Sequence, residues 1–332
     1  MADVTDAIKC TEVNIESFEV PAGKTFELDL LQGTTVNMNG NITFGFSNWA
    51  GPLFLVSGKD ITFNGNGYTF DGNGPAYWDG KGLNNGTTKP APMMKIKISG
   101  IYQEVVVLNS PARAYSVDSS APLLMTSLTV DNSAGDKPNN NSDGKAAGHN
   151  TDGFDVSASN LVISNSNVHN QVTPPVLLVN FLSAQYIVPR MTVWLLIKVL
   201  MSPLLATPAP EVMVSQSQQA FRIKTVKSAT NSSVSGVHYS GNTATGCTKY
   251  GVIIDQSYPS TLGQPGNGVT ISDIDFSGSK TNIVVGSDAE RVAVNCGSGT
   301  CTGTWDWSEL EVSGGKAGNI TGFSGITGFS QT

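Results

Sequence analysis

Charged side chains are scarce in this sequence, where Asp, Glu, Lys and Arg together make up 14% of 332 residues. Neutral Asn, Ser and Thr, with 36 Gly, must therefore supply most of the polar surface. Such a composition favours β structure over helix. The net charge of −7 and the lack of a basic stripe argue against nucleic acid as a partner.

Cysteine is also rare. Cys10, Cys247, Cys296 and Cys301 are too few for a disulfide scaffold, but they allow one or two bridges in an oxidising compartment. We expect Cys296 to pair with Cys301. The first residues contain no basic stretch followed by an apolar one, so no signal peptide is visible.

Short stretches that alternate apolar and polar residues recur along the chain, separated by Asn, Gly and Ser. This period of two is typical of strands with one buried face. The stretches repeat at roughly 20 to 30 residues, the period of stacked solenoid coils. The pattern predicts parallel β-helix coils over 20–170 and 219–312, with a β-sandwich as the alternative.

The segment Val172–Ser217 breaks this pattern. It contains no Gly and no Asp, and it holds six of the 16 prolines. Its most apolar part, Met191–Ala206, includes Lys198 and is shorter than the roughly 20 apolar residues that a spanning helix needs. A buried helix is disfavoured because the run lacks caps and is flanked by prolines. We expect 172–217 to be irregular.

The string GHNTDGFDV, Gly148–Val156, carries the strongest candidates for chemistry. Hydrolysis of a glycosidic bond with inversion needs a carboxylic acid and a water-activating carboxylate about 6.5 to 9.5 Å apart. Asp152 and Asp155 lie in and beside a predicted strand. Taken alone, an Asn-Thr-Asp triplet is more often a turn than a site.

The string nevertheless resembles the NTD motif of fungal endo-polygalacturonases, which are pectin-degrading glycoside hydrolases. The motifs that support the resemblance are WAGPLF from Trp49, DGNGPAYWDGKG from Asp71, VDNSAGD from Val130, FRIK from Phe221, KYGV from Lys249 and CGSGTCTGTWDWS from Cys296. The resemblance spans about 280 residues. It implies an all-β, right-handed parallel β-helix in a single domain over 1–332, disrupted around 172–217. It also implies hydrolysis, with inversion, of α-1,4-galacturonosyl bonds in demethylated pectin.

The resemblance also implies roles for five residues. Asp152 matches one of three catalytic aspartates, Arg222 and Lys224 match a cationic pair that binds the galacturonate carboxylate, and Tyr250 matches a substrate-contacting tyrosine. The resemblance also places Asn150 in the lining of the site. A bidentate Arg and a point-charge Lys suit a polyanionic substrate. The alternative for Arg222 and Lys224 is a solvated strand edge.

The same resemblance implies a secreted monomer that acts on polygalacturonate or pectin, with no membrane or nucleic-acid partner. No metal or cofactor is expected. The chain departs from the family because its DDC and GHG motifs, with two aspartates, a histidine and a joining disulfide, are missing between Gln171 and Phe221. In the family pattern, Cys10 also lacks its partner and Cys247 has no counterpart.

The genetic code offers a reason for the missing motifs. A one-base shift over Met191–Ser217 permits codons for DDC and GHG at the family's separation. Val172–Arg190 then reads as an unspliced intron, because a Val codon can open with GT and an Arg codon can supply the closing AG. We therefore interpret 172–217 as foreign sequence replacing catalytic coils, with about one further coil lost before Gln219.

Two other classes of function remain open. A non-catalytic β-helix could bind pectin through Arg222, Lys224 and Tyr250. A pectate lyase shares the architecture but uses Ca²⁺. It is disfavoured because NTD and RIK follow the hydrolase pattern and no Asp-rich calcium cluster is evident.

Overall fold

The structure is a computed structural model. It describes residues 4–83, 86–119, 121–156, 161–164, 166–171, 177–181, 183–186, 195–196, 219–241 and 243–331. The chain divides into two units, Met1–Thr173 and Pro174–Thr332. The expectation of one domain over 1–332 stays a prediction.

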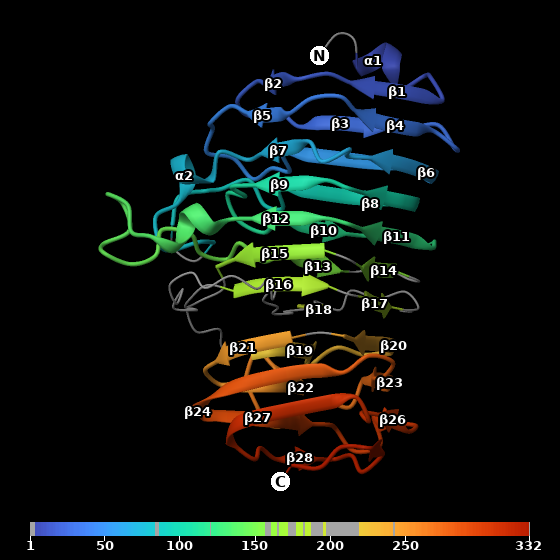
Figure 1. Cartoon of the computed structure of the whole chain (residues 1–332), viewed down its shortest axis with the longest axis vertical. Helices are drawn as coiled ribbons and strands as arrows, with labels where there is room; N and C mark the ends of the chain where they lie inside the picture. The colour runs from blue at the N-terminus through green and yellow to red at the C-terminus, as the bar shows by residue number, and fades with distance from the viewer. Residues whose placement is uncertain are drawn as a thin grey trace, which may run out of the picture. The chain divides into compact units, whose positions relative to one another are not determined.

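The regular elements of the first unit are almost all strands, joined by turns and loops (Figure 1). Its strands are β1 (Glu12–Ile15), β2 (Phe18–Val20), β3 (Phe26–Asp29), β4 (Thr35–Met38), β5 (Ile42–Phe44), β6 (Phe54–Asn64), β7 (Thr69–Asp71), β8 (Met94–Gln103), β9 (Val106–Leu108), β10 (Tyr115–Val117), β11 (Leu123–Thr126), β12 (Thr129–Asp131), β13 (Phe154–Val156), β14 (Leu161–Ser164) and β15 (Ser166–Asn170). Its helical turns are α1 (Val4–Ala7), α2 (Gly74–Tyr77) and the 3-10 turn η1 (Ser133–Asp136).

Parallel pairing joins these strands into stacked coils. One sheet runs β1-β4-β6-β8-β11-β14, with β3 beside β6 and β10 between β8 and β13. A second sheet runs β15-β12-β9-β7-β5-β2. Within each sheet a strand pairs with a strand of the next coil, as the stacked rungs of Figure 1 show.

The second unit has the same construction. Its strands are β16 (Leu177–Phe181), β17 (Ser183–Tyr186), β18 (Leu195–Leu196), β19 (Gln219–Val226), β20 (Ser232–Ser240), β21 (Thr243–Cys247), β22 (Tyr250–Tyr258), β23 (Val269–Phe276), β24 (Thr281–Asn295), β25 (Cys301–Thr302), β26 (Trp305–Asp306), β27 (Leu310–Lys316), β28 (Ile320–Thr321) and β29 (Ile326–Thr327). Parallel sheets run β20-β23-β25 and β19-β22-β24-β21, with β27 and β28 beside β24. β17 departs from this order by running antiparallel to β20.

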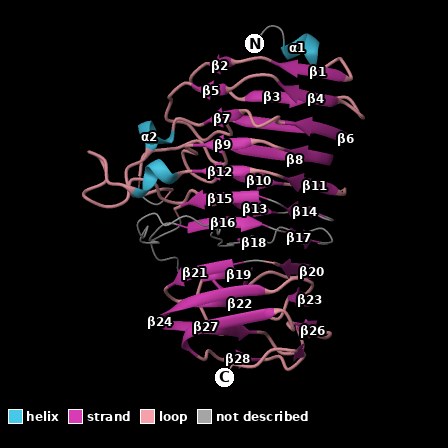
Figure 2. Ribbon diagram, in the orientation of Figure 1, coloured by secondary structure: helices cyan, strands magenta, loops and turns pink. Residues whose placement is uncertain are grey.

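Both units confirm the prediction of an all-β parallel β-helix, and strand dominates the described chain in Figure 2. The described helical elements, of four residues each, are too short to span a membrane. Of the span 172–217, the structure describes only the backbone of β16, β17 and β18. The expected irregularity of this span therefore stays a prediction.

Inward-facing side chains of successive coils form continuous apolar ladders. One ladder in the first unit consists of residues that are paired in register and all buried, namely Val13, Val36, Phe63, Tyr102, Met125 and Ile163. Stacked aromatic rings add to the core of each unit. The ring centroids of Phe63 and Tyr102 are 4.9 Å apart in the first unit, and those of Tyr239 and Phe276 are 4.6 Å apart in the second. A single coil cannot bury its inner face, so each coil depends on its neighbours for a core.

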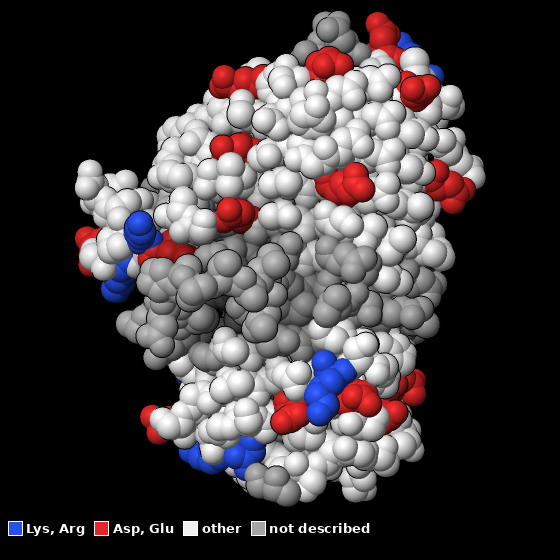
Figure 3. All heavy atoms as spheres, in the orientation of Figure 1, with Lys and Arg blue, Asp and Glu red and all other residues white. Residues whose placement is uncertain are grey.

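On the outer face of the coils, neutral amide side chains form hydrogen-bonded stacks where charged residues are scarce. The Asn37 side chain donates to Asn14, Asn64 donates to Asn37 at 2.9 Å, and Gln103 donates to Asn64 at 2.9 Å. Amides can repeat along a stack because each one both donates and accepts, whereas like charges would repel. Most of the face drawn in Figure 3 accordingly carries no charged side chain.

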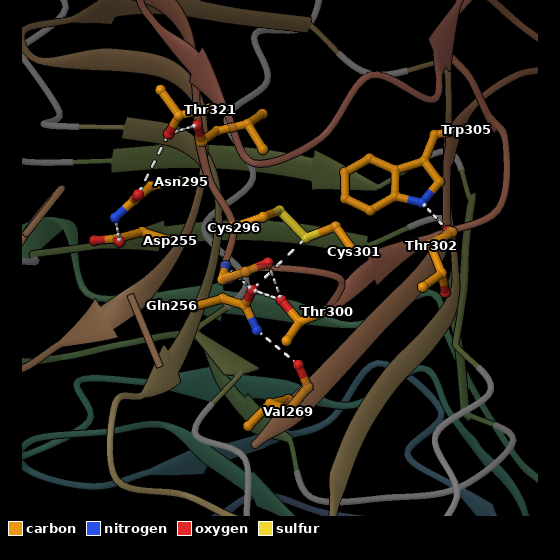
Figure 4. Close-up of a disulfide and its surroundings, with 12 residues drawn as sticks. Asp255, Gln256, Val269, Asn295, Cys296, Thr300, Cys301, Thr302, Trp305 and Thr321 are labelled. Carbon is orange, nitrogen blue, oxygen red and sulfur yellow. Dashed lines mark hydrogen bonds between the residues drawn. A yellow bond between two sulfur atoms is a disulfide. The ribbon is translucent and has the colours of Figure 1, made fainter. Parts of the chain in front are cut away.

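The disulfide expected between Cys296 and Cys301 is present, with Cα atoms 5.9 Å apart (Figure 4). Cys10 is an exposed free cysteine, in line with its missing family partner. Buried Gln256 supports the disulfide loop. Its side-chain oxygen accepts from Gly297 N at 2.9 Å and Thr300 Oγ1 at 2.6 Å, and its Nε2 donates to the Val269 carbonyl at 2.7 Å.

We expect Gln256→Met to lower the free energy of unfolding by about 1–3 kcal/mol, because it leaves the buried Gly297 N–H without its acceptor. Urea unfolding measures this loss. Gln32→Met is the matched control, since Gln32 is exposed and bonds only at the surface, to Asp60. Its effect should stay within about 0.5 kcal/mol. Equal losses in the two variants would contradict the role given to Gln256.

Candidate functional site

The string Gly148–Val156 leads into β13, which pairs in parallel with β10. Phe154 stacks on Tyr115 with ring centroids 4.9 Å apart, and the Asp152 carbonyl accepts from Ala114 N at 2.8 Å. Asp152 thus lies just before a short, fully buried strand, and it is 7% exposed. A carboxyl group in this position has a defined direction and little contact with bulk water.

A buried network supports the backbone beside Asp152. Thr151 N donates to the Gln171 carbonyl at 2.9 Å, and the Thr151 hydroxyl donates to Gln171 Oε1 at 2.9 Å and accepts from Gln171 N at 2.6 Å. Gln171 Nε2 donates to Asp136 Oδ1 at 2.7 Å, and His169 Nε2 lies 2.7 Å from Asp136 Oδ2. A Cβ atom at Gly148 would collide with the Gln171 side chain, so a larger residue there would displace Gln171 from this network.

Asn150 links this network to a second loop. Its backbone is left-handed, with φ 54°, and its Oδ1 accepts from Leu83 N at 3.2 Å. That loop is held by Lys89, whose side chain is 1% exposed and whose Nζ lies 2.9 Å from Asp79 Oδ1 and 2.9 Å from the Gly82 carbonyl. Asn150 therefore has a structural role in joining the loops, in addition to any contact with substrate.

Asp155 is ion-paired with Arg113, with Oδ2 and Nη1 2.9 Å apart. Its side chain is 7% exposed, and it stands opposite Ser116 in the register of β13 and β10. This partly buried ion pair joins the strand that follows Asp152 to the segment just before β10. The resemblance assigned a catalytic role to Asp152 and none to Asp155, and in the structure Asp155 is paired with Arg113.

In the second unit, β19 carries the two predicted cations. Phe221 and Ile223 are buried in the core, while Arg222 and Lys224 alternate with them and are half-buried. The alternation places both cations on the same outward face, as the period of two requires. The motif FRIK is thus one strand with an apolar inner side and a cationic outer side.

The neighbouring strand β22 lies in register beside this face (Figure 1). Lys224 stands opposite Asp255, which is 0% exposed. Burial lowers the pKa of the Arg222 guanidinium, while electrostatic interaction with Asp255, and then with Tyr258 and Tyr250, opposes the shift. Arginine stays protonated in either case. The buried carboxylate of Asp255 thus partly offsets the positive charge of this face.

Tyr250 begins β22 and pairs with Glu290 on β24. Burial raises the pKa of the Tyr250 hydroxyl, nearby Glu290 and Asp255 raise it further, and Arg222 opposes them. Tyr250 is therefore a neutral phenol at ordinary pH, able to donate a hydrogen bond. Its electrostatic coupling to Arg222 indicates that the two side chains belong to one cluster.

The structure thus places Arg222 and Lys224 on one strand of the second unit and Tyr250 on the adjacent strand, where it is coupled to Arg222. It places Asp152 and Asn150 in one loop of the first unit. Asp255 was not anticipated from the sequence. Its only sequence signal was an aspartate alternating into the outer face within an apolar run, IIDQS. Within the described part of the chain, no cluster of three or more His, Cys, Asp and Glu side chains could hold a metal ion.

Comparison with known families adds a further observation. The profile described as "Glycosyl hydrolases family 28" matches residues 10–172 and 209–326. The chain belongs to this family. The interval without a match, 173–208, lies inside the anomalous span 172–217.

Individual relatives in glycosyl hydrolases family 28 agree with this assignment. A probable endopolygalacturonase of Aspergillus fumigatus is 34% identical over 330 residues, covering 92% of this chain and 82% of the relative. Endopolygalacturonase B of Aspergillus oryzae is 37% identical over 322 residues, covering 92% and 84%. The solved structure of endopolygalacturonase I from Stereum purpureum, complexed with two galacturonate, is 41% identical with a TM-score of 0.80. That match covers 100% of this chain and 98% of the solved one.

Proposed function

We propose that this chain is a polygalacturonase by descent, built to hydrolyse α-1,4-galacturonosyl bonds of demethylated pectin with inversion. The observation that carries the proposal is the cationic face of β19. A chain of net charge −7 presents Arg222 and Lys224 side by side, with Tyr250 on the adjacent strand. The solved relative from Stereum purpureum holds galacturonate, a carboxylate sugar of the kind that such a face suits.

Each residue has a chemical role in this proposal. Arg222 and Lys224 bind the galacturonate carboxylate through charge-assisted hydrogen bonds, and half-burial strengthens these because water competes less. Tyr250 donates a hydrogen bond to the sugar as a neutral phenol. Asp152 supplies one of the carboxyl groups that inversion requires, and Asn150 holds the loop beside it.

The chain as it stands lacks the rest of the catalytic set. We infer that 172–217 replaces the coils that carry DDC and GHG, because the family profile has no match over 173–208. Inversion needs two carboxyl groups in one step, and Asp152 is a single one. The present chain would then act as a non-catalytic pectin-binding β-helix protein, which is the second candidate function.

Location and assembly follow from the same proposal. We propose a secreted monomer that acts on polygalacturonate outside the cell. The disulfide between Cys296 and Cys301 supports an oxidising compartment.

Binding of trigalacturonate tests the cationic face. We expect Arg222→Met to raise the Kd by about tenfold or more, because a hydrogen-bonded charge pair contributes about 1.5–3 kcal/mol. Calorimetric titration of the full chain at millimolar ligand measures this change. Lys280→Met is the control, since Lys280 is an exposed cation of the same unit, paired only with exposed Glu311. Equal Kd values for Arg222→Met and the unaltered chain would refute the assignment.

A further inference from the structure

The ring of Tyr258 contacts Lys224, one of the two proposed substrate-binding cations. The Nζ atom of Lys224 lies 4.4 Å from the centroid of the Tyr258 ring. Tyr258 ends β22 opposite Val226, two residues beyond Lys224 on β19, and its side chain is 36% exposed. A cation within about 6 Å of an aromatic centroid is attracted to the face of the ring.

The side chain of Asp255 accepts hydrogen bonds from both ends of the loop that follows β22. Its Oδ1 accepts from Ser257 N at 3.0 Å, and its Oδ2 accepts from Leu262 N at 2.9 Å. The Ser257 hydroxyl in turn accepts from Gly263 N at 3.0 Å. Both ends of the loop are therefore tied to one buried carboxylate, and Tyr258 is the residue directly after the first tie.

Asn295 of β24 adds a third attachment. Its Nδ2 donates to Asp255 Oδ1 at 2.9 Å and to the Gly263 carbonyl at 2.8 Å (Figure 4 shows the Asn295–Asp255 contact). Asp255 is 0% exposed and Asn295 is 8% exposed, so these bonds are shielded from water. The loop is held by buried side chains of two strands, and the backbone from which the Tyr258 ring projects is consequently anchored on both sides.

The contact with the Tyr258 ring matters for binding because the Lys224 side chain is flexible. A Lys side chain has four rotatable bonds, and fixing it on a ligand costs conformational entropy. A cation already restrained over a ring loses less freedom on binding, which favours a carboxylate ligand. The ring also shields one side of the ammonium from water, and this strengthens its attraction for an anion.

We propose that Tyr258 is a positioning residue for substrate binding, whose ring directs the Lys224 ammonium toward a galacturonosyl carboxylate. The proposal rests on the function assigned to Lys224 above. It adds a determinant of selectivity, since a methyl-esterified unit offers no charge to a positioned ammonium. Tyr258 acts through Lys224 rather than by its own contact with the reacting bond.

A double-mutant cycle on the full chain tests this. We expect Tyr258→Leu to raise the Kd for trigalacturonate about threefold, the order of a partly exposed cation–π contact. Tyr258→Phe should retain the Kd because it keeps the ring. In the Lys224→Met background, Tyr258→Leu should have no further effect. Tyr68→Leu is the matched control, since Tyr68 is 37% exposed in the first unit.

The outcomes separate this proposal from the function on which it rests. If the unaltered chain does not bind millimolar trigalacturonate, or if Lys224→Met leaves the Kd unchanged, the substrate-binding assignment fails and the Tyr258 proposal with it. If Lys224→Met weakens binding but Tyr258→Leu does not, only the Tyr258 proposal is overturned. A threefold loss that persists in the Lys224→Met background overturns it as well, because Tyr258 then acts independently of Lys224.

Discussion

Restoring the original reading frame through 172–217, with the missing coil, should raise the hydrolysis of demethylated pectin from background by at least about 10²–10⁴-fold. The present chain keeps Asp152 but neither of the other two aspartates nor the histidine that the family pattern implies. Inversion requires a general acid and a water-activating base at once. Loss of either group costs about 10²–10⁴ in rate.

The measurement is the release of reducing ends from polygalacturonate by the two purified chains at equal concentration. Products without the ultraviolet absorbance of an unsaturated sugar would identify hydrolysis rather than elimination. Strong activity in the chain as it stands, or none in the restored chain, would refute the interpretation of 172–217. The transcript sequence across codons 165–225 supplies an independent check.

The second large effect concerns Asp152 itself. In the restored chain, we expect Asp152→Asn to lower kcat by about 10²–10⁴ while changing KM little, because asparagine keeps the shape but cannot exchange the proton. The buried position of Asp152, 7% exposed, leaves little room for water to substitute. Steady-state kinetics on polygalacturonate measures both parameters.

Asp29→Asn is the control for Asp152→Asn, since Asp29 lies exposed on β3 of the same unit and accepts a hydrogen bond from Ser57. Its kcat should match that of the restored chain. A loss confined to KM in Asp152→Asn would assign Asp152 to binding instead of catalysis. Thermal unfolding of both variants checks that the fold is retained.

Several parts of the fold were accessible from the sequence alone. The resemblance implied that Arg222 and Lys224 act as a pair, and the alternation of β19 places them on the same face. The disulfide predicted between Cys296 and Cys301 is present, at a sequence separation of five. These features depend on neighbours along the chain, where the geometry of a strand or a short loop is enough to decide the outcome.

The contacts between coils were not accessible in the same way. Asn64 bonds to Asn37 at a separation of 27 residues, but Gln103 bonds to Asn64 at a separation of 39. Loops of different length between strands make the coil period irregular, so the register of one coil on the next cannot be calculated from spacing. The bonds from Gln171 to Thr151 and Asp136 depend on such register, and they were missed.

The sequence by itself therefore determined the class of the fold, the period of two that marks its strands, and the motifs that place the chain in glycosyl hydrolases family 28. The tertiary structure alone decided that Asn295, 40 residues further along the chain, donates to Asp255, and that the Tyr258 ring meets Lys224. The reason is physical. Strand periodicity is a local property of the backbone, whereas the partner of a buried carboxylate is whichever donor the stacking of coils brings within about 3 Å.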